Sequence, residues 1–503
     1  MNFQIGRIPE PNLLFGGNTA TSDPIFGILQ YGPYSSFEEG EVDFLTVRLG
    51  IIGSEECIEK LIDFLNGIIE PISPNNVTTG IFGFPGLGKD SPLRMQIRTP
   101  LGLQEPIPQD LLEAALSEPS IHGRLQRTFA LYEQRILKLS AKEPRPMVVL
   151  CALPKEIFTK CKRPGMKIDR LIFRERKFKP KKRNWIFIDE KEEEIHYFGD
   201  YDFHNALKLV AMKANLPTQL IKYTTWEKGL IPIEDRPRSK VQDPVTVAWN
   251  FAVALYYKAR GVPWKFTKLT DETLYAGIEF FQEISEEERV RASMARIFLD
   301  TGESFILRGE AFRWEPDQKK RERSPHLTSD QAEQLTQAIL DQYYDHRNSY
   351  PNRVVIHKSS NFNSDELAGF RNKTRSIKAC DFITIIDTPV RFYRDGKNPI
   401  VRGTVVSGKK DHYLFTTGYC PTLLKYVGKG VPEPLLIRPF YQSNSIKKIC
   451  EEIMALTKLD WNTVSYNKRL PVTLSIADRV GEILSEPRAK ELTEPAYEYR
   501  FYM

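Results

Sequence analysis

Between residues 146 and 258, apolar strand-like runs alternate with amphipathic helical runs, and this alternation limits the fold more than any other feature. Residues 146–153 carry no charged side chain, which predicts a strand buried on both faces. A helix is predicted over about 202–214, a short apolar strand opens at Gln219, and a further helix is predicted over 245–258. Such alternation is typical of a parallel sheet covered by helices, so we expect a Rossmann-like α/β layer.

The second half of the chain begins with strands and then alternates strands with helices. The predicted elements are a strand over 274–281, a hairpin of 294–299 with 304–309, a helix over 329–347, a strand over 353–357, a helix over 364–374, a strand over 382–386, a hairpin over 400–416, and helices over 446–456 and 470–484. This order predicts a second α/β unit.

Length and composition are those of an ordinary soluble globular protein. The 503 residues, 41% of them hydrophobic and 27% charged, suffice for about two to four domains. No apolar run is long enough to span a membrane, and the N-terminus lacks the apolar segment of a signal peptide. The six cysteines form no Cys-x-x-Cys pair, which favours reduced thiols in the cytoplasm and argues against a structural zinc site.

One segment is strongly basic although the formal net charge of the chain is only +6. Between Lys155 and Arg183 there are 13 Lys or Arg residues against 3 Asp or Glu residues, interleaved with aromatic side chains. This composition favours contact with a polyanion such as a nucleic-acid backbone, although a solvated loop has the same composition. The candidate backbone contacts are Lys177, Lys179, Lys181, Lys182 and Arg183.

Four polar residues of the first half could together bind a terminal phosphate. His204 and Lys208 lie four residues apart, so they share a helix face near its positive end. Gln219 opens the next strand, and Lys258 ends the later helix. Two lysines with a histidine and an amide suit a phosphate, whereas solvated side chains on a helix surface are the alternative.

These four residues resemble the pocket in which the MID domain of Argonaute proteins holds the 5′-phosphate of a guide strand. Residues 9–17 and 23–34 (Pro-Glu-Pro-Asn-Leu-Leu-Phe-Gly-Gly and Asp-Pro-Ile-Phe-Gly-Ile-Leu-Gln-Tyr-Gly-Pro-Tyr) resemble the linker strand that precedes MID; taken alone, they predict a strand and a turn. The second half, which closes with Ile476-Ala-Asp-Arg-Val-Gly, resembles the RNase H-like fold of a PIWI domain.

The resemblance covers nearly the whole chain and is closest to short prokaryotic Argonautes, which consist of MID and PIWI domains without N or PAZ domains. It implies a lead-in region over 1–40, a MID domain over 41–243 and a PIWI domain over 244–503. It also implies a guide RNA, a single-stranded DNA target, and Mg²⁺ bridging the guide phosphate and the C-terminal carboxylate of Met503. The aromatic residues near that end fit a buried terminus or a surface-packed one.

RNase H-type cleavage uses two divalent metals held by several carboxylates. At the positions where slicing PIWI domains carry metal ligands, this sequence resembles the family pattern only in part. Glu279 stands in Gly-Ile-Glu where the family has Asp, Ser359 replaces a second Asp, and Asp478 matches the closing helix. We therefore expect an inactive nuclease site, with Glu279 and Asp478 serving as polar groups of the fold.

A guide-binding chain that cannot cleave needs another polypeptide to act. The resemblance implies a heterodimer with an APAZ-containing protein that carries a TIR, sirtuin-like or nuclease effector, and it implies oligomerisation on activation. The expected role is immunity against plasmids or phage, through NAD⁺ depletion or DNA degradation. Two alternatives stay open: a guide-dependent endonuclease with a non-standard metal site, and a nucleic-acid-binding protein that uses no guide.

Overall fold

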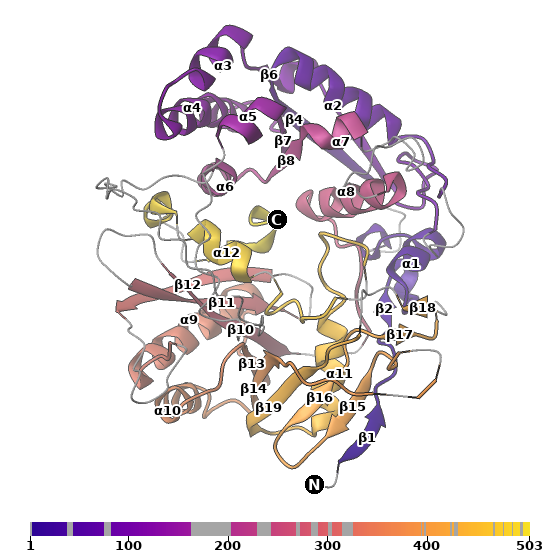
Figure 1. Cartoon of the computed structure of the whole chain (residues 1–503), viewed down its shortest axis with the longest axis vertical. Coiled ribbons are helices and arrows are strands. Elements are labelled where there is room, and N and C mark those ends of the chain that lie inside the picture. Colours follow the sequence, from indigo (N-terminus) through magenta and orange to yellow (C-terminus); the bar gives the residue numbers. More distant parts are fainter. Residues whose placement is uncertain are drawn as a thin grey trace, which may run out of the picture.

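Two β-sheets dominate the chain and lie one above the other in Figure 1. The computed structural model describes residues 3–37, 44–74, 82–161, 203–228, 243–267, 272–282, 290–299, 304–313 and 325–503, with short gaps at 394, 397–398, 423–424, 427–430, 466–467, 476, 485 and 493–495. Within this described part, no helix has both the length and the apolar character that a membrane span requires.

The smaller sheet comes from the first half of the chain and is parallel throughout. Its strands follow the order β5-β4-β7-β8, with β6 beside β4: β4 (Leu45–Gly53), β5 (Met95–Arg98), β6 (Gln104–Pro106), β7 (Val148–Leu153) and β8 (Thr218–Lys222). All six residues of β7 are buried, as expected for a strand with helices on both faces.

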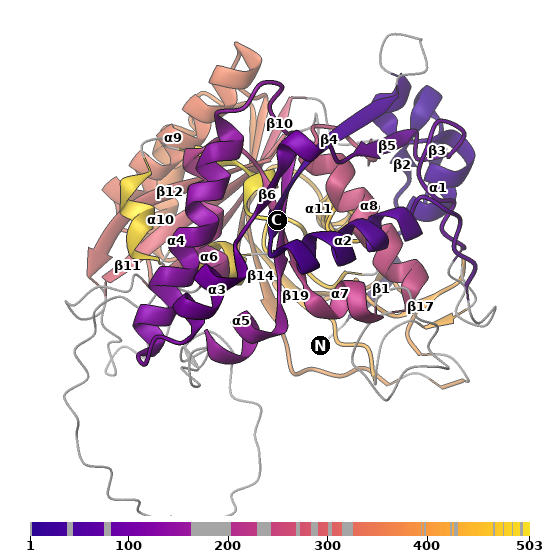
Figure 2. The same ribbon diagram turned by 90° about the horizontal axis from the view of Figure 1, so that it is seen from above.

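Helices cover both faces of this sheet, as Figure 2 shows from above. On one face pack α3 (Gln109–Leu116), α4 (Ile121–Ser140) and α6 (Phe203–Lys213); on the other pack α2 (Glu55–Gly67) and α8 (Pro244–Lys258). The short α5 (Lys155–Lys160) and α7 (Tyr223–Lys228) follow β7 and β8. This arrangement confirms the expected Rossmann-like α/β layer.

The larger sheet has ten strands, mainly from the second half of the chain. In order they are β1 (Gln4–Arg7), β15 (Thr404–Ser407), β16 (His412–Leu414), β19 (Leu435–Gln442), β14 (Ala379–Asp387), β13 (Arg353–Lys358), β10 (Thr273–Gln282), β11 (Val290–Phe298), β12 (Ser304–Arg313) and β20 (Ala496–Glu498). The strands β10, β13 and β14 are parallel, and the other neighbouring pairs are antiparallel. The helices α9 (Ser329–Arg347) and α10 (Ser364–Lys373) share one core with this sheet, and α11 (Ile446–Leu456) packs in another.

One hydrophobic core continues from the smaller sheet into the second half of the chain. It contains Trp249 and Tyr257 of α8, Ile483 of α12 (Ala477–Leu484) and Tyr502 near the C-terminus. The ring of Tyr257 lies 4.5 Å from that of Trp461 and 6.3 Å from that of Tyr499, measured between centroids. This packing places the C-terminus between the two halves, as Figure 1 shows.

The structure corrects two sequence-based expectations. Residues 24–31 form the helix α1 (Pro24–Tyr31) where a strand and a turn were predicted. Asp23 accepts hydrogen bonds from the backbone N–H groups of Ile25 and Phe26, and Pro24 occupies the first turn, so the Asp-Pro pair is a helix start.

The second correction concerns the last predicted helix. The helix expected over 470–484 begins only at Ala477, and residues 472–475 form a turn instead. Val472 donates its backbone N–H to Leu456 at 2.8 Å, and Leu474 donates to Pro471 at 2.9 Å. Neither hydrogen bond follows the i to i−4 pattern of an α-helix. The apolar side chains here have helical spacing, but they pack from a turn.

A buried ionic cluster connects the N-terminal region to the larger sheet. The carboxylate of Glu10 lies 2.8 Å from the ammonium of Lys458 and 3.0 Å from Nε of Arg402, and both cationic side chains are at most 1% exposed. Lys458 also donates to the carbonyls of Pro11 and Ser22 at 2.8 Å. Burial lowers the pKa of Lys458 to about 8 in spite of the Glu10 charge.

Replacing Glu10 by alanine should destabilise the protein, because two buried cations would lose their carboxylate. Breaking a buried ion pair from one side costs about 3–5 kcal/mol in the free energy of unfolding, which denaturant titration measures. Glu451→Ala, which removes an exposed partner of Lys447 on α11, is the control and should have little effect. Equal effects of the two substitutions would contradict a structural role for this cluster.

Candidate functional site

Two buried lysines from different helices meet at the C-terminus of the chain. Lys208 of α6 donates to the carbonyl of Thr218 at 2.6 Å and to the main-chain oxygen of Met503. Lys258 of α8 donates to the same two oxygens, at 3.0 Å and 2.9 Å. It also donates to Oε1 of Gln219. The structure therefore brings together Lys208, Gln219, Lys258 and Met503, which lie far apart in the sequence.

Burial gives this lysine cluster (Lys208, Lys258, Thr218, Gln219 and Met503) its electrostatic character. Each lysine side chain is only 1% exposed, and Met503 is 4% exposed. Lysine is rarely buried to this degree unless oxygen acceptors surround its ammonium group. Two ammonium groups at such short range from shared oxygens create a strongly positive point where α6 and α8 meet the start of β8.

The remaining predicted residue of this group, His204, lies one helical turn before Lys208 on α6. Its side chain is half-buried, and Nδ1 is 3.2 Å from Oδ1 of Asn205. His204 thus lies on the same helix face, on the N-terminal side of the lysine cluster. The predicted backbone contacts Lys177, Lys179, Lys181, Lys182 and Arg183 lie outside the described residues.

The predicted nuclease positions lie at neighbouring strand ends of the larger sheet. Glu279 is half-buried on β10, and Ser359 is exposed directly after the parallel strand β13, where Ile278 pairs with Lys358. The helix α12 contains position 478, but the side chain of Asp478 lies outside the described residues. Within the described part of the chain, no group of three or more His, Cys, Asp or Glu side chains could hold a metal ion.

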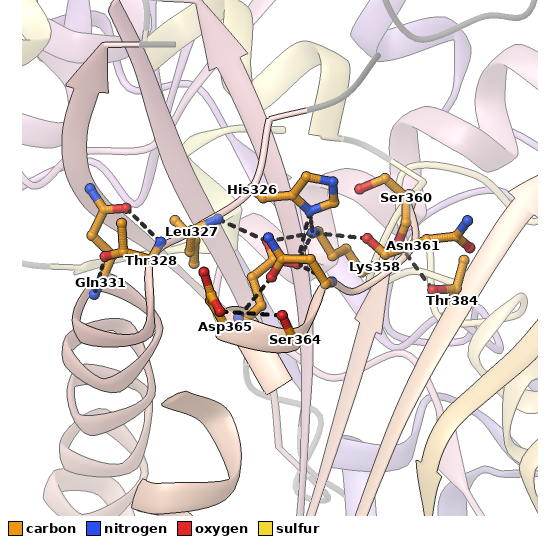
Figure 3. Close-up of polar contacts among 12 residues, drawn as sticks. His326, Leu327, Thr328, Gln331, Lys358, Ser360, Asn361, Ser364, Asp365 and Thr384 are labelled. Carbon is orange, nitrogen blue, oxygen red and sulfur yellow. Dashed lines mark hydrogen bonds and ion pairs between the residues drawn. The ribbon is translucent and has the colours of Figure 1, made fainter. Parts of the chain in front are cut away.

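A buried ionic cluster that sequence reasoning missed lies beside Ser359. The ammonium of Lys358 is 2.5 Å and 2.7 Å from the carboxylate oxygens of Glu366, and Nδ1 of His326 is 3.0 Å from the same carboxylate. Figure 3 shows His326 and Lys358 lying next to each other in this cluster. Glu366 also accepts from the backbone N–H groups of Leu327 and Asn363. A detectable sequence signal was the capping box that begins at Asn363 and places Glu366 three residues later.

This second cluster includes the carboxylate of Glu366, which lies close in sequence to the degenerate position Ser359. Glu366 is 0% exposed and its charge is matched by Lys358, so it serves the fold at this strand end. Burial by itself would raise the pKa of the Glu366 carboxyl, but hydrogen bonds from His326 and Lys358 and the charge of Lys358 hold that pKa below 4.5.

No protein-family model and no curated protein matches the sequence. Solved structures do: Clostridium butyricum Argonaute, bound to a guide DNA and a 19-mer target DNA, is similar at 16% identity with a TM-score of 0.64, over 97% of this chain and 53% of that one. Drosophila Piwi is similar at 13% identity and a TM-score of 0.57, over 99% and 56% of the two chains. A. aeolicus Argonaute is similar at 14% identity and a TM-score of 0.53, over 99% of this chain and 55% of that one.

The chain has an Argonaute-like fold. Its mixed α/β structure matches the MID and PIWI portion of those structures, which confirms the fold class expected from the sequence. The chain spans about half the length of the Argonaute and Piwi structures that it matches. At identities below one fifth, the similarity to these structures is a similarity of fold.

The Lys358–Glu366 pair should make stability depend on acid pH. A carboxyl whose pKa is depressed by folding stabilises the protein above its unfolded pKa, and that contribution is lost as the pH falls through the folded pKa. We expect the free energy of unfolding to decrease as the pH falls below 4.5, and to decrease less steeply in Glu366→Gln. At pH 7 this variant should be less stable by about 3–5 kcal/mol, because Lys358 stays buried without its partner.

Denaturant titrations between pH 3 and pH 7 measure both effects. Glu113→Gln, which changes an exposed carboxylate on α3, is the matched control and should follow the wild-type pH dependence. The same slope in Glu366→Gln and wild type would contradict the assigned ion pair.

Proposed function

We propose that the chain binds the 5′-phosphorylated end of a guide RNA and pairs this guide with single-stranded DNA, as the sensor of a prokaryotic defence complex. The observation that carries this proposal is the convergence of Lys208 and Lys258 on shared oxygens at the start of β8. Phosphate groups favour such paired cations, and charge-assisted hydrogen bonds are the strong ones. His204 and Gln219, from the same helix and strand, complete the proposed 5′-phosphate pocket.

The oxygen atoms of this pocket fit the magnesium ion that the family resemblance implies. Gln219 Oε1, the carbonyl of Thr218 and the end of Met503 meet at the two lysines, and oxygen is the ligand that Mg²⁺ prefers. The carboxylate of Met503 and the guide phosphate would hold the ion. When bound, Mg²⁺ would offset the negative charge between these two groups.

Affinity for the strands would come mainly from their backbone phosphates, with base pairing selecting the target. The similar structure from Clostridium butyricum was solved with guide and target DNA, which supports a guided mode of binding. The resemblance to short Argonautes favours RNA as the guide here. The basic block with Lys177, Lys179, Lys181, Lys182 and Arg183 is the proposed additional backbone contact.

The PIWI-like half of this proposed sensor is inactive as a nuclease. Ser359 supplies no charge at the end of β13, Glu366 is matched by Lys358, and Glu279 is one methylene longer than aspartate. The effector activity would therefore come from an APAZ-containing partner with a TIR, sirtuin-like or nuclease domain. An endonuclease that uses Glu279, Asp478 and a further ligand is the alternative.

Binding of a phosphorylated guide should depend on both buried lysines. The double substitution Lys208→Ala with Lys258→Ala should weaken the binding of a 5′-phosphorylated guide RNA about a hundredfold or more, because each charge-assisted contact contributes about 1.5–3 kcal/mol. Binding of a 5′-hydroxyl guide should be weakened far less. Lys213→Ala, on the same helix but paired with Glu491 at the surface, is the control and should preserve the preference. Equal losses for both guides in a filter-binding assay would show that the lysines hold no terminal phosphate.

The isolated chain should not cut its target. With guide RNA, complementary single-stranded DNA and either Mg²⁺ or Mn²⁺, we expect full-length DNA on a denaturing gel, because the described carboxylates form no metal group. Guide-dependent cleavage would establish the endonuclease alternative, and loss of that cleavage in Glu279→Gln would identify its ligand.

The complex with a partner should show the activity that the chain lacks. The chain is co-expressed with the protein encoded beside it, and guide and target are then added to the complex. We expect this addition to trigger NAD⁺ loss or DNA degradation, together with a change in the size of the assembly. A near-complete switch requires the target-bound state to favour the active assembly by about 5.5 kcal/mol. Guide and target should act only together; activity without them, or an inert complex with every substrate, would contradict the sensor role.

A further inference from the structure

A second cationic feature lies next to the lysine cluster, at the amino ends of β7 and β8. A cavity of about 250 Å³ opens there, between Met147, Pro217 and the C-terminal residues Arg500 and Phe501. Within the part of the chain that the structure describes, five cationic side chains line it, namely Arg48, Arg145, Lys258, Arg260 and Arg500, and no carboxylate does. We call it the arginine cavity.

Two of these arginines, Arg48 and Arg145, are held by backbone carbonyls. Nε of Arg48 donates to the carbonyl of Arg145 at 3.3 Å, and NH2 of Arg145 donates to Ala214 and, at 3.1 Å, to Asn215. Among the described residues, neither arginine pairs with a carboxylate, and Nε of Arg145 is buried without a hydrogen-bond partner. Their charges are therefore oriented by the fold, and no described carboxylate neutralises them.

The other two arginines share one acid. Arg260 lies 3.8 Å from Glu498, and Arg500 pairs with the same carboxylate. The side chain of Arg500 is 12% exposed, and its guanidinium lies 6.0 Å from the ring centroid of Tyr257. Over the described ranges, these ion pairs set one carboxylate, Glu498, against four guanidinium groups. Positive charge is therefore in excess on the described lining of the cavity, and like charges at this range repel one another.

We propose that the arginine cavity binds a small phosphoryl anion of the pyrophosphate type. Planar guanidinium groups match phosphoryl oxygens in bidentate geometry, and an anion would remove the repulsion among them. A water molecule takes about 30 Å³ of liquid volume, so the cavity holds several waters or one small anion. Its apolar wall, which includes Met147 and Phe501, strengthens such charge interactions by excluding water.

The phosphoryl group has two potential sources, a free small anion or an internal phosphate of a bound strand. The cavity would recognise the phosphoryl chemistry from either source, and binding of a free anion does not require a bound guide. Lys258 nevertheless lines the arginine cavity and contacts Met503, so the cavity and the lysine cluster share one cation. Two ligands that share a charge are coupled reciprocally, and each should therefore weaken the binding of the other.

Isothermal titration calorimetry with inorganic pyrophosphate tests the proposal on the full chain. We expect one site per chain, with at least a tenfold loss of affinity in Arg48→Gln with Arg145→Gln and a smaller loss in Arg48→Lys, which keeps the charge. Arg135→Gln is the matched control, because Arg135 also donates to two backbone carbonyls but lies on α4. Arg48→Gln alone serves if the double variant does not fold. Equal affinity in wild type and Arg48→Gln, or equal binding of citrate at matched ionic strength, would overturn the proposal.

Two further arms separate the sources and keep this proposal distinct from guide binding. If the ligand is a free anion, Arg48→Gln with Arg145→Gln should preserve the preference for a 5′-phosphorylated guide, and Lys208→Ala should preserve pyrophosphate binding. If a bound strand supplies the phosphate, Arg48→Gln with Arg145→Gln should weaken the binding of 5′-phosphoryl and 5′-hydroxyl guides equally. A bound guide should then fully displace pyrophosphate. Pyrophosphate that fails to bind, with no effect of the arginines on either guide, would refute both sources.

Discussion

Two ammonium groups buried side by side are the constraint on which the centre of this molecule depends. Lys208 and Lys258 are almost fully removed from water, and each needs several oxygen acceptors there. The acceptors come from β8 and from the last residue of the chain, so α6, α8, β8 and the C-terminus must all be in place together. A site of this kind exists only when the two halves of the chain are packed.

The hydrophobic core supplies the free energy that holds this arrangement. Trp249 and Tyr257 on α8 and Trp461, Tyr499 and Tyr502 from the far end of the chain share one core, and all five are buried. Large aromatic side chains contribute heavily to such packing, and their rings stack at fixed distances. The C-terminal residues are therefore a part of the fold, which explains why Arg500 and Phe501 line a cavity and Met503 reaches both lysines.

Buried ion pairs repeat this logic elsewhere. Glu10 with Lys458 and Arg402 joins segments distant in sequence, whereas Glu366 with Lys358 joins the end of β13 to the first turn of α10. Each cluster leaves a costly unpaired charge if one partner is removed. The lysine cluster differs because its oxygens are mainly backbone and amide atoms. A positive site without a full complement of carboxylates is suited to an incoming anion, whereas a matched pair such as Lys358–Glu366 is suited to stability.

The sequence alone determined the element types, since periodicity and caps act locally: α9 and α11 have the predicted bounds, and the alternation in the first half predicted the parallel sheet. It also placed Lys208, Gln219, Lys258 and Met503 in one pocket, but only through family resemblance. Local patterns failed where a turn kept apolar spacing, over 472–475, and where Asp23 and Pro24 started a helix. Only the tertiary structure decided which charges meet. Glu366 meets Lys358 because of how α10 is placed against the end of β13, and the four arginines of the cavity meet because segments far apart in the sequence pack together.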